Sequence, residues 1–441
     1  MPGLGFATAE RYEQKQPNVG ISIDESISGM LFDTSHRQDP FEDFPAAYSW
    51  FGDGQVQVIN NLSDAEDFGI TEGGIMGGVP YYHIKCFYDF IGSDMQLYIM
   101  FANCSSNDEI DFSPIQNMQI ACGGKLYQIG VWTEWPLLRL KEDESYGFTD
   151  LLSNINIQTN ELCGVVGEVT DSSSPLNIIL CPNTAYVENG ESRIYTVDYK
   201  KLPDGTVLNF PKISVILGQN GTDDVHAMQA GNYGYSPVGL LGYAMACVTL
   251  AFAEENIGHV EKFNLNKNED IDSPELGFGN MESDTPLYTP ISDIINIRAN
   301  LISLKGYIIP TTYKAKEGEL FFSNDQTMSN GDYLTIANNR VIHKCRRIIK
   351  SVMLPYINSN ADIDPVTGKL SGTSIAIFSS NILTALDKGM MNRDGQSQID
   401  GRNVKIDDDQ NIIDNDELKI ECTIIPACSN SQITVEELYS I

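Results

Sequence analysis

Short apolar runs alternate with helix-like segments through the first half of the chain. Four of these runs are too short for helices and are typical of buried strands; they lie at 96–101, 127–132, 176–180 and 213–217. Between them, Pro80 and Pro114 stand where helices would begin, and a third helix is predicted over 148–162. Strands that alternate with helices indicate an α/β (α+β) fold with mixed sheets and flanking helices.

The remainder of the chain predicts four divisions. Residues 1–30 read as an N-terminal arm, and 31–263 as the α/β region. Residues 264–330, which are rich in polar residues and proline, indicate a loop-rich connection with a small β region. Residues 331–441 form a C-terminal domain, with helices predicted at 334–354 and 373–389 and strands at 418–426 and 432–438.

The longest apolar stretch spans residues 238–253. It predicts a helix packed on most sides, which starts at Ser236 and Pro237 because serine caps helices and proline suits their first turn. A membrane-spanning helix needs about 20 apolar residues. We therefore expect no membrane insertion, and the N-terminus does not resemble a signal peptide.

The net charge of the chain limits its possible partners, and the spacing of its cysteines indicates their chemical state. The chain has 60 acidic and 28 basic residues among 441, for a formal net charge of -32. Such a chain repels nucleic-acid phosphates, so no nucleic acid is expected as a partner. Its nine cysteines include no C-x-x-C pair, which predicts free buried thiols.

Spacings that carry catalysis or metal binding are missing. None of the five histidines lies at metal-ligand spacing from another histidine or a cysteine. The glycine cluster at 73–78 could cradle a phosphate, but no lysine follows it, and a turn is the better interpretation. The segment 362–368 resembles only the start of a calcium loop. We therefore predict no catalytic residue, no metal site and no cofactor.

A basic cluster stands out in this acidic chain. It consists of Arg340, Lys344, Arg346, Arg347 and Lys350, and no acidic residue lies between positions 333 and 361. One interpretation is a solvated helix face with local ion pairs. The other is a docking surface for an acidic partner, such as a second copy of the chain.

The C-terminal strands allow two interpretations as well. In the strand at 418–426, apolar residues alternate with polar ones, as in a half-buried strand. The apolar residues are Leu418, Ile420, Cys422 and Ile424. The strands could complete the sheet of their own domain. They could also be donated to a neighbouring subunit, where strand addition satisfies backbone hydrogen bonds across the boundary.

Several stretches resemble the contractile tail sheath family of phages and related injection particles, and most closely a Mu-like branch. They are VGISIDESISGMLFD, YYHIKCFYDFIGSDMQLYIMF, GGKLYQIGVW, the segment from ISVILGQNG through SPVGLLGYAMACVTLAFAEENIGHVEKFNL, and LKIECTIIPACSNSQITVEEL. The resemblance implies a multi-domain sheath-like architecture with extended N- and C-terminal arms. It also implies a homo-oligomeric helical sheath around an inner tube protein, bounded by baseplate and terminator proteins. Such a particle is assembled in the bacterial cytoplasm and contracts to drive the tube through a target envelope.

The resemblance also assigns roles to residues. Strand exchange between subunits would involve Ile21, Ile23, Leu418, Ile420, Cys422, Ile424, Ile433 and Val435. From charge and position, the basic cluster is our hypothesis for contact with the tube or an adjacent subunit. Two alternatives stay open: another self-assembling phage protein, such as a baseplate or capsid component, and an α/β enzyme.

Overall fold

The computed structural model describes most of the chain between residues 24 and 427. Its gaps are 38, 93–94, 141–145, 149, 164–173, 185–186, 189–190, 193–208, 269, 277–280, 283–284, 287–305, 332, 357–361, 365 and 411–417. Four of the predicted exchange residues lie outside the described residues; they are Ile21, Ile23, Ile433 and Val435.

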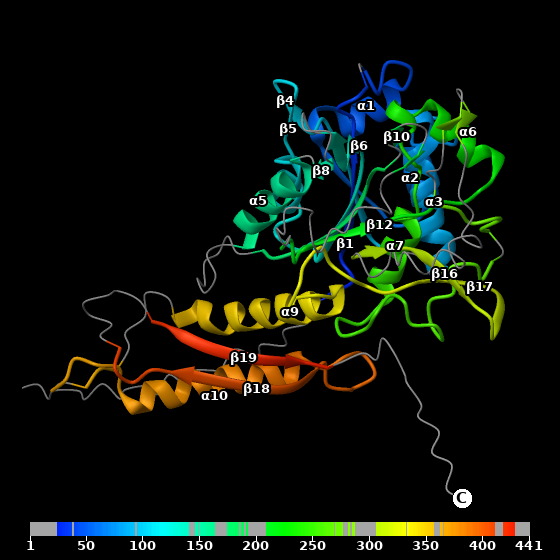
Figure 1. Cartoon of the computed structure of the whole chain (residues 1–441). Helices are drawn as coiled ribbons and strands as arrows, with labels where there is room; N and C mark the ends of the chain where they lie inside the picture. Colours follow the sequence, from blue (N-terminus) through cyan, green and yellow to red (C-terminus); the bar gives the residue numbers. More distant parts are fainter. Residues whose placement is uncertain are drawn as a thin grey trace, which may run out of the picture.

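A seven-stranded sheet forms the centre of the molecule (Figure 1). Its spatial order is β15 (Tyr307–Ile308), β12 (Ile213–Ile216), β9 (Asn177–Asn183), β6 (Gln128–Pro136), β1 (Ser28–Asp33), β3 (Leu97–Ala102) and β2 (Val56–Ile59). All neighbours run parallel except β2 and β3, and Met30 lies opposite both Ile99 and Gly130. The four predicted strands are confirmed, because continuous apolar runs suit a sheet covered on both faces.

Helices cover both faces of the sheet (Figure 1). One face packs against α1 (Pro45–Phe51), α2 (Leu62–Asp67), α3 (Val79–Ile91), α6 (Asp223–Gly231) and α7 (Leu241–Leu250). The other packs against α4 (Pro114–Ala121) and α5 (Leu151–Cys163). The helices predicted from Pro80, Pro114 and the 148–162 pattern are therefore confirmed. None of the described helices has the length and apolarity to cross a membrane.

The helix predicted from Ser236 starts later than expected, at Leu241. The Trp132 indole Nε1 donates to the carbonyl oxygens of Pro237 (3.3 Å) and Val238 (3.0 Å), so these groups are used outside a helix. Gly239 has a φ of +86° and would place a Cβ only 2.1 Å from the Cys181 sulfur. This non-helical entry positions α7, which is almost wholly buried as predicted, against α3.

The described part of the C-terminal domain contains two α-helices and one hairpin (Figure 1). They are α9 (Ile336–Met353), α10 (Gly372–Gly389), β18 (Ile399–Ile406) and β19 (Ile420–Pro426). Helix α9 lies between the central domain and the rest of this unit, whose small core joins Val341 and Ile348 to Ile382 and Leu386. Both helices and the strand at 418–426 are confirmed, while β18 was missed because its sequence, IDGRNVKI, is mostly polar.

Part of segment 264–330 belongs to the central domain. Strand β15 is an edge of the large sheet, so that domain extends past residue 263 and the predicted boundary there is wrong. The small β region exists as the pair β16 (Pro310–Tyr313) and β17 (Lys316–Phe322). The remaining strands form short pairs: β4 (Ser105–Ser106) with β5 (Glu109–Ile110), β7 (Leu138–Leu140) with β8 (Tyr146–Phe148), β10 (Val187–Glu188) with β11 (Glu191–Ser192), and β13 (Met281–Glu282) with β14 (Thr285–Pro286).

Candidate assembly region

Helix α9 carries the basic cluster into the joint between the two domains. The Thr335 side chain caps its start by accepting from the Asn338 amide, which satisfies one of the first-turn donors. Val341, Cys345 and Ile348 face the small C-terminal core. Three basic side chains of the helix, those of Arg340, Lys344 and Arg347, contact residues outside the C-terminal domain, and the structure separates their roles.

Arg340 is completely buried, so the prediction that it contacts a tube or neighbour is wrong. Its guanidinium donates to three carbonyl oxygens, those of Phe252 (3.0 Å), Ala251 (3.1 Å) and Glu25 (3.2 Å). The first two directly follow α7, where the unpaired carbonyls of the helix end favour a cation. Burial lowers the pKa of Arg340 and the nearby Glu25 carboxylate opposes that shift. Arg340 therefore fastens α9 to the end of α7.

Lys344 is also buried and fails the same prediction. Its ammonium forms an ion pair with Glu25 and donates to the Gln398 Oε1 atom at 2.6 Å. Glu25 lies three residues before the start of β1, and Gln398 directly before β18. A charge of this kind is buried only when paired and hydrogen-bonded, which is the case here.

Arg347 binds the central domain from the same helix. It donates to the carbonyl oxygens of Gly124 (2.7 Å), Leu126 (2.7 Å) and Pro175 (2.8 Å), and its guanidinium carbon lies 4.3 Å from the centre of the Tyr127 ring. These bonds hold its guanidinium against the central domain, but the side chain is only half-buried, so contact of Arg347 with a partner stays a prediction. Arg346 and Lys350 are half-buried, and for these two contact with a partner stays a prediction.

The hairpin β18–β19 presents one face to the helices and one to the outside. Cys422 pairs with Val404 and Ile420 with Ile406, and these inner side chains pack on the C-terminal core together with Leu418 and Ile424. The outward residues of β19 are exposed, including Ile425 at 55%. The alternation predicted from sequence is confirmed, and it places this strand in the sheet of its own domain.

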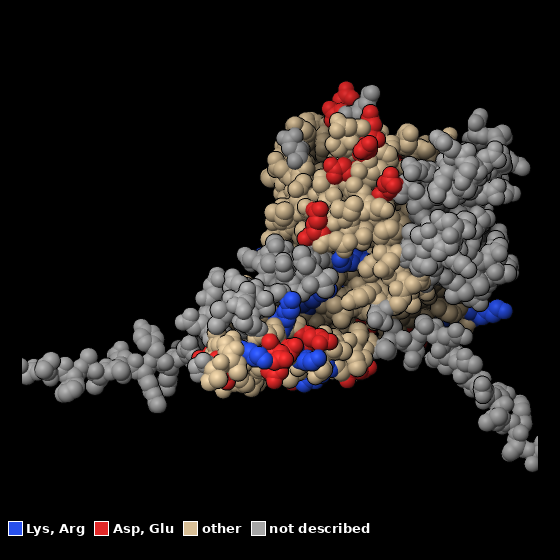
Figure 2. Space-filling view, turned by 60° about the vertical axis from the view of Figure 1, so that its left-hand side comes forward, with Lys and Arg blue, Asp and Glu red and all other residues tan. Residues whose placement is uncertain are grey.

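The edges of the hairpin are the open part of this region. Among the described strands, β18 and β19 form a sheet of only two, so each has an outer edge that no described strand pairs. Opposite charges alternate on the surrounding surface, where Lys369 pairs with Asp409 and Arg402 with Asp387. Figure 2 shows this mixture of charge on the C-terminal domain, whereas acidic side chains dominate the visible upper part of the central domain.

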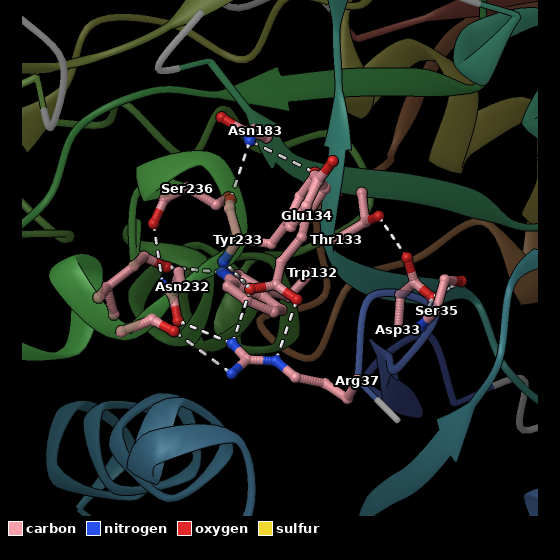
Figure 3. A network of polar contacts seen from close by, with 12 residues as sticks. Asp33, Ser35, Arg37, Trp132, Thr133, Glu134, Asn183, Asn232, Tyr233 and Ser236 are labelled. Atoms are coloured by element: carbon pink, nitrogen blue, oxygen red, sulfur yellow. Dashed lines mark hydrogen bonds and ion pairs between the residues drawn. The ribbon is translucent and has the colours of Figure 1, made fainter. Parts of the chain in front are cut away.

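A second polar network lies at the carboxyl ends of β1 and β6 (Figure 3). Glu134 accepts from Arg37 at both Nη2 (2.6 Å) and Nε (3.1 Å) and from the Tyr233 backbone amide (2.6 Å). Arg37 also donates to Asn232, and the Thr133 hydroxyl donates to Asp33 at 2.5 Å. Sequence patterns did not single out these residues, because their positions converge only in the folded sheet.

The position of that network matters for function. In doubly wound sheets, ligands bind where the strand order reverses, which here is between β1 and β6. In this chain the charged groups at that point bind each other and the segment Asn232–Ser236. The network therefore holds a loop of the chain against the sheet.

The two weak motifs are local turns. Gly73, Gly77 and Gly78 all have positive φ, and a Cβ on Gly78 would lie 2.7 Å from the Gly73 nitrogen, so the glycine cluster is a tight turn into α3. Asp364 accepts from the amides of Val366 (2.8 Å) and Thr367 (3.0 Å), which lowers the pKa of its carboxyl. Within the described residues no group of three potential ligands could hold a metal ion.

The fold of this chain, a doubly wound central domain followed by a helix–hairpin domain, is similar to that of a solved contractile sheath protein, as the resemblance implied. The sheath of an extracellular contractile injection system, the PVC particle in its contracted state, aligns with 100% of this chain and 99% of its own at a TM-score of 0.56 and 10% identity. A chain of the anti-feeding prophage baseplate in the contracted state aligns with 99% of this chain and 98% of its own, with a TM-score of 0.50 and 10% identity.

Sequence comparison adds a domain match. Residues 332–440 match the family described as DUF2586, C-terminal domain. That segment contains α9, α10 and the hairpin. A comparison with curated protein sequences gives no match.

Proposed function

We propose that the chain is the subunit of a contractile tail sheath, which polymerises around an inner tube and contracts to drive the tube through a target envelope. The observation that carries this proposal is the alignment of the whole chain, both domains in one order, with a sheath protein in its contracted state. A match limited to the doubly wound domain would not carry it, because that domain type serves many unrelated functions.

The hairpin gives the proposal a mechanism of assembly. A two-stranded sheet is marginal by itself, and a strand from a neighbouring copy would extend it while satisfying its edge. Residues 1–23 would supply one such strand through Ile21 and Ile23. Residues 428–441 would supply another through Ile433 and Val435. Leu418, Ile420, Cys422 and Ile424 then act on the acceptor side, by holding β19 against its own domain.

A structural role also agrees with the polar groups of the central domain. The charged side chains at the carboxyl ends of β1 and β6 bind each other, so they already have partners within the chain. We propose that this domain is a rigid body of the sheath subunit without a catalytic task. The subunit would belong to a virion tail or injection particle assembled in the bacterial cytoplasm, with tube, baseplate and terminator proteins as its partners.

Electron microscopy of the purified full chain, alone and coexpressed with candidate tube proteins, tests the proposal. Hollow striated tubes are expected, and shells or discrete rings would instead indicate a capsid or baseplate component. Chains lacking 1–23 or 428–441 should keep the thermal stability of the monomer but form no tubes. A thermal shift of several degrees with nucleotides or divalent metals would favour the enzyme alternative.

A further inference from the structure

Gln398 uses every hydrogen-bonding atom of its buried amide. Its Nε2 donates to the Glu254 Oε2 atom at 2.7 Å and to the Glu25 Oε1 atom at 3.1 Å, and its Oε1 accepts from Lys344 at 2.6 Å. The side chain is 0% exposed. A carboxamide is suited to this place because it offers two donors and an acceptor in one plane.

Glu25 is the second member of the polar cluster around Gln398. It lies where the described part of the chain begins, which we call the N-terminal root. Its carboxylate binds Lys344 and Gln398, and its Oε1 atom also accepts from the Ala253 amide at 3.3 Å. Its carbonyl oxygen accepts from Arg340. Two carboxylates and two cations thus meet around one neutral amide, which balances the buried charge.

The C-terminal root, which is Ala427 at the end of the described part of the chain, contacts the same cluster. The Ala427 amide donates to the Gln398 carbonyl oxygen at 3.1 Å, directly after β19 ends. Glu25 and Ala427 are the positions from which residues 1–23 and 428–441 continue. Both roots therefore contact Gln398, although about 400 positions separate them in the sequence.

We propose that Gln398 is a positioning residue that couples the roots of the two terminal segments, so that displacement of one root is transmitted directly to the other. This inference rests on the proposed function for its purpose: in a sheath mesh, load that enters one exchanged segment would pass to the other without loosening either domain. Contiguous networks of hydrogen bonds and ion pairs are one physical means by which separate sites are coupled.

Amide hydrogen exchange at single residues, measured on the free full-length subunit, tests the coupling. The first reporter is the Ala253 amide, which donates to Glu25 at the N-terminal root. The second is the Ala427 amide, at the C-terminal root. Gln398→Met keeps the size of the side chain but removes its three bonds. One of them holds the Glu25 carboxylate that accepts from the Ala253 amide, so exchange at Ala253 should become about tenfold faster. Glu25→Gln should speed exchange at Ala427 by a smaller factor.

The matched control is Gln410→Met. Gln410 bonds the Lys419 and Asp407 carbonyl oxygens on the exposed side of the same domain, so its loss should leave both reporters unchanged. Gln398→Asn, which keeps the amide but shortens its reach, provides a second variant should Gln398→Met not fold. Faster amide exchange at Ala253 alone, with exchange at Ala427 unchanged in Gln398→Met and Glu25→Gln, would overturn the coupling.

The outcome is separable from that of the proposed function. Transfer between the roots in a chain that forms no tubes would support the coupling and contradict the sheath. Tubes formed by a chain whose roots respond independently would support the sheath and contradict the coupling.

Discussion

The central sheet and the C-terminal hairpin use their strands in opposite ways. The inner strands of the large sheet are buried on both faces and paired on both edges; Ile179 in β9 is 0% exposed. In β19, every second residue is exposed and only one edge has a described partner. The first arrangement is complete within one chain, whereas the outer edges of the second have no partner among the described strands, as strand addition requires.

Under the proposed function, this difference assigns rigidity to the central sheet and assembly to the hairpin. The two regions meet at α9, whose cations Arg340 and Arg347 bind six carbonyl oxygens between them. The joint is therefore built of buried charge-assisted bonds, which are stronger than neutral ones. We infer that the central and C-terminal domains move together, and that changes of subunit arrangement occur outside this joint.

The same substitution in the two strands should give the largest contrast. Ile179→Asp places a carboxylate in the central sheet without a partner and should destabilise the protein by more than about 4 kcal/mol. Thr423→Asp on the exposed face of β19 should change the free energy of unfolding by less than about 0.5 kcal/mol. Denaturant titration measures both, and similar losses would show that the hairpin face is buried in the free subunit.

Removal of Arg340, the fully buried cation of the joint at α9, should have the next largest effect on stability. Arg340→Met leaves the carbonyl oxygens of Glu25, Ala251 and Phe252 without their cationic donor, at a cost of about 3–5 kcal/mol. Arg346→Met on the same helix is the control and should stay within about 0.5 kcal/mol of the parent. Chemical unfolding curves decide, and a mild Arg340→Met would contradict a joint held by buried charge.

Sequence patterns predicted elements better than they predicted the surroundings of individual side chains. The buried strands and both C-terminal helices were found because their periodicity is local. The burial of Arg340 and Lys344 was not predicted, because their partners approach only through tertiary packing. These partners are carbonyl and carboxylate oxygens near residues 25 and 252. For the same reason the polar strand β18, paired by β19 and backed by α10, was not recognised.

Acid should weaken the central domain through His83. Its Nε2 donates to the Val238 carbonyl oxygen (2.9 Å) and its Nδ1 accepts from the Gly242 amide (3.3 Å), so only the neutral ring satisfies both contacts. Burial lowers the pKa of His83 from 6.5 to about 3, with the Val238 bond opposing. The stability that this group contributes is thus complete above pH 6.5 and is lost as the pH falls toward 3.

The size of that effect follows from proton linkage. Between these two pH values the unfolded chain binds one more proton at this site, which lowers the free energy of unfolding by up to about 1.4 kcal/mol per pH unit. Urea titrations from pH 7 to 4 should show a shallower dependence for His83→Gln than for the parent. His259→Gln, which changes a half-exposed ring, is the control and should leave the slope unchanged.

Charge reversal at Arg346 should have the smallest effect on the monomer, and its comparison with Arg347 separates the surface of α9 from the joint. Arg346→Glu should leave the free energy of unfolding within about 0.5 kcal/mol, because its side chain is half-buried and the described contacts of the joint do not use it. Arg347→Glu should lower stability clearly, since it removes three bonds to carbonyl oxygens. If Arg346 contacts the tube or a neighbouring subunit, Arg346→Glu will also reduce tube formation in sedimentation and microscopy. Normal assembly by this stable variant would restrict the role of the basic cluster to the joint, and the surface that meets the tube would then have to lie on another element.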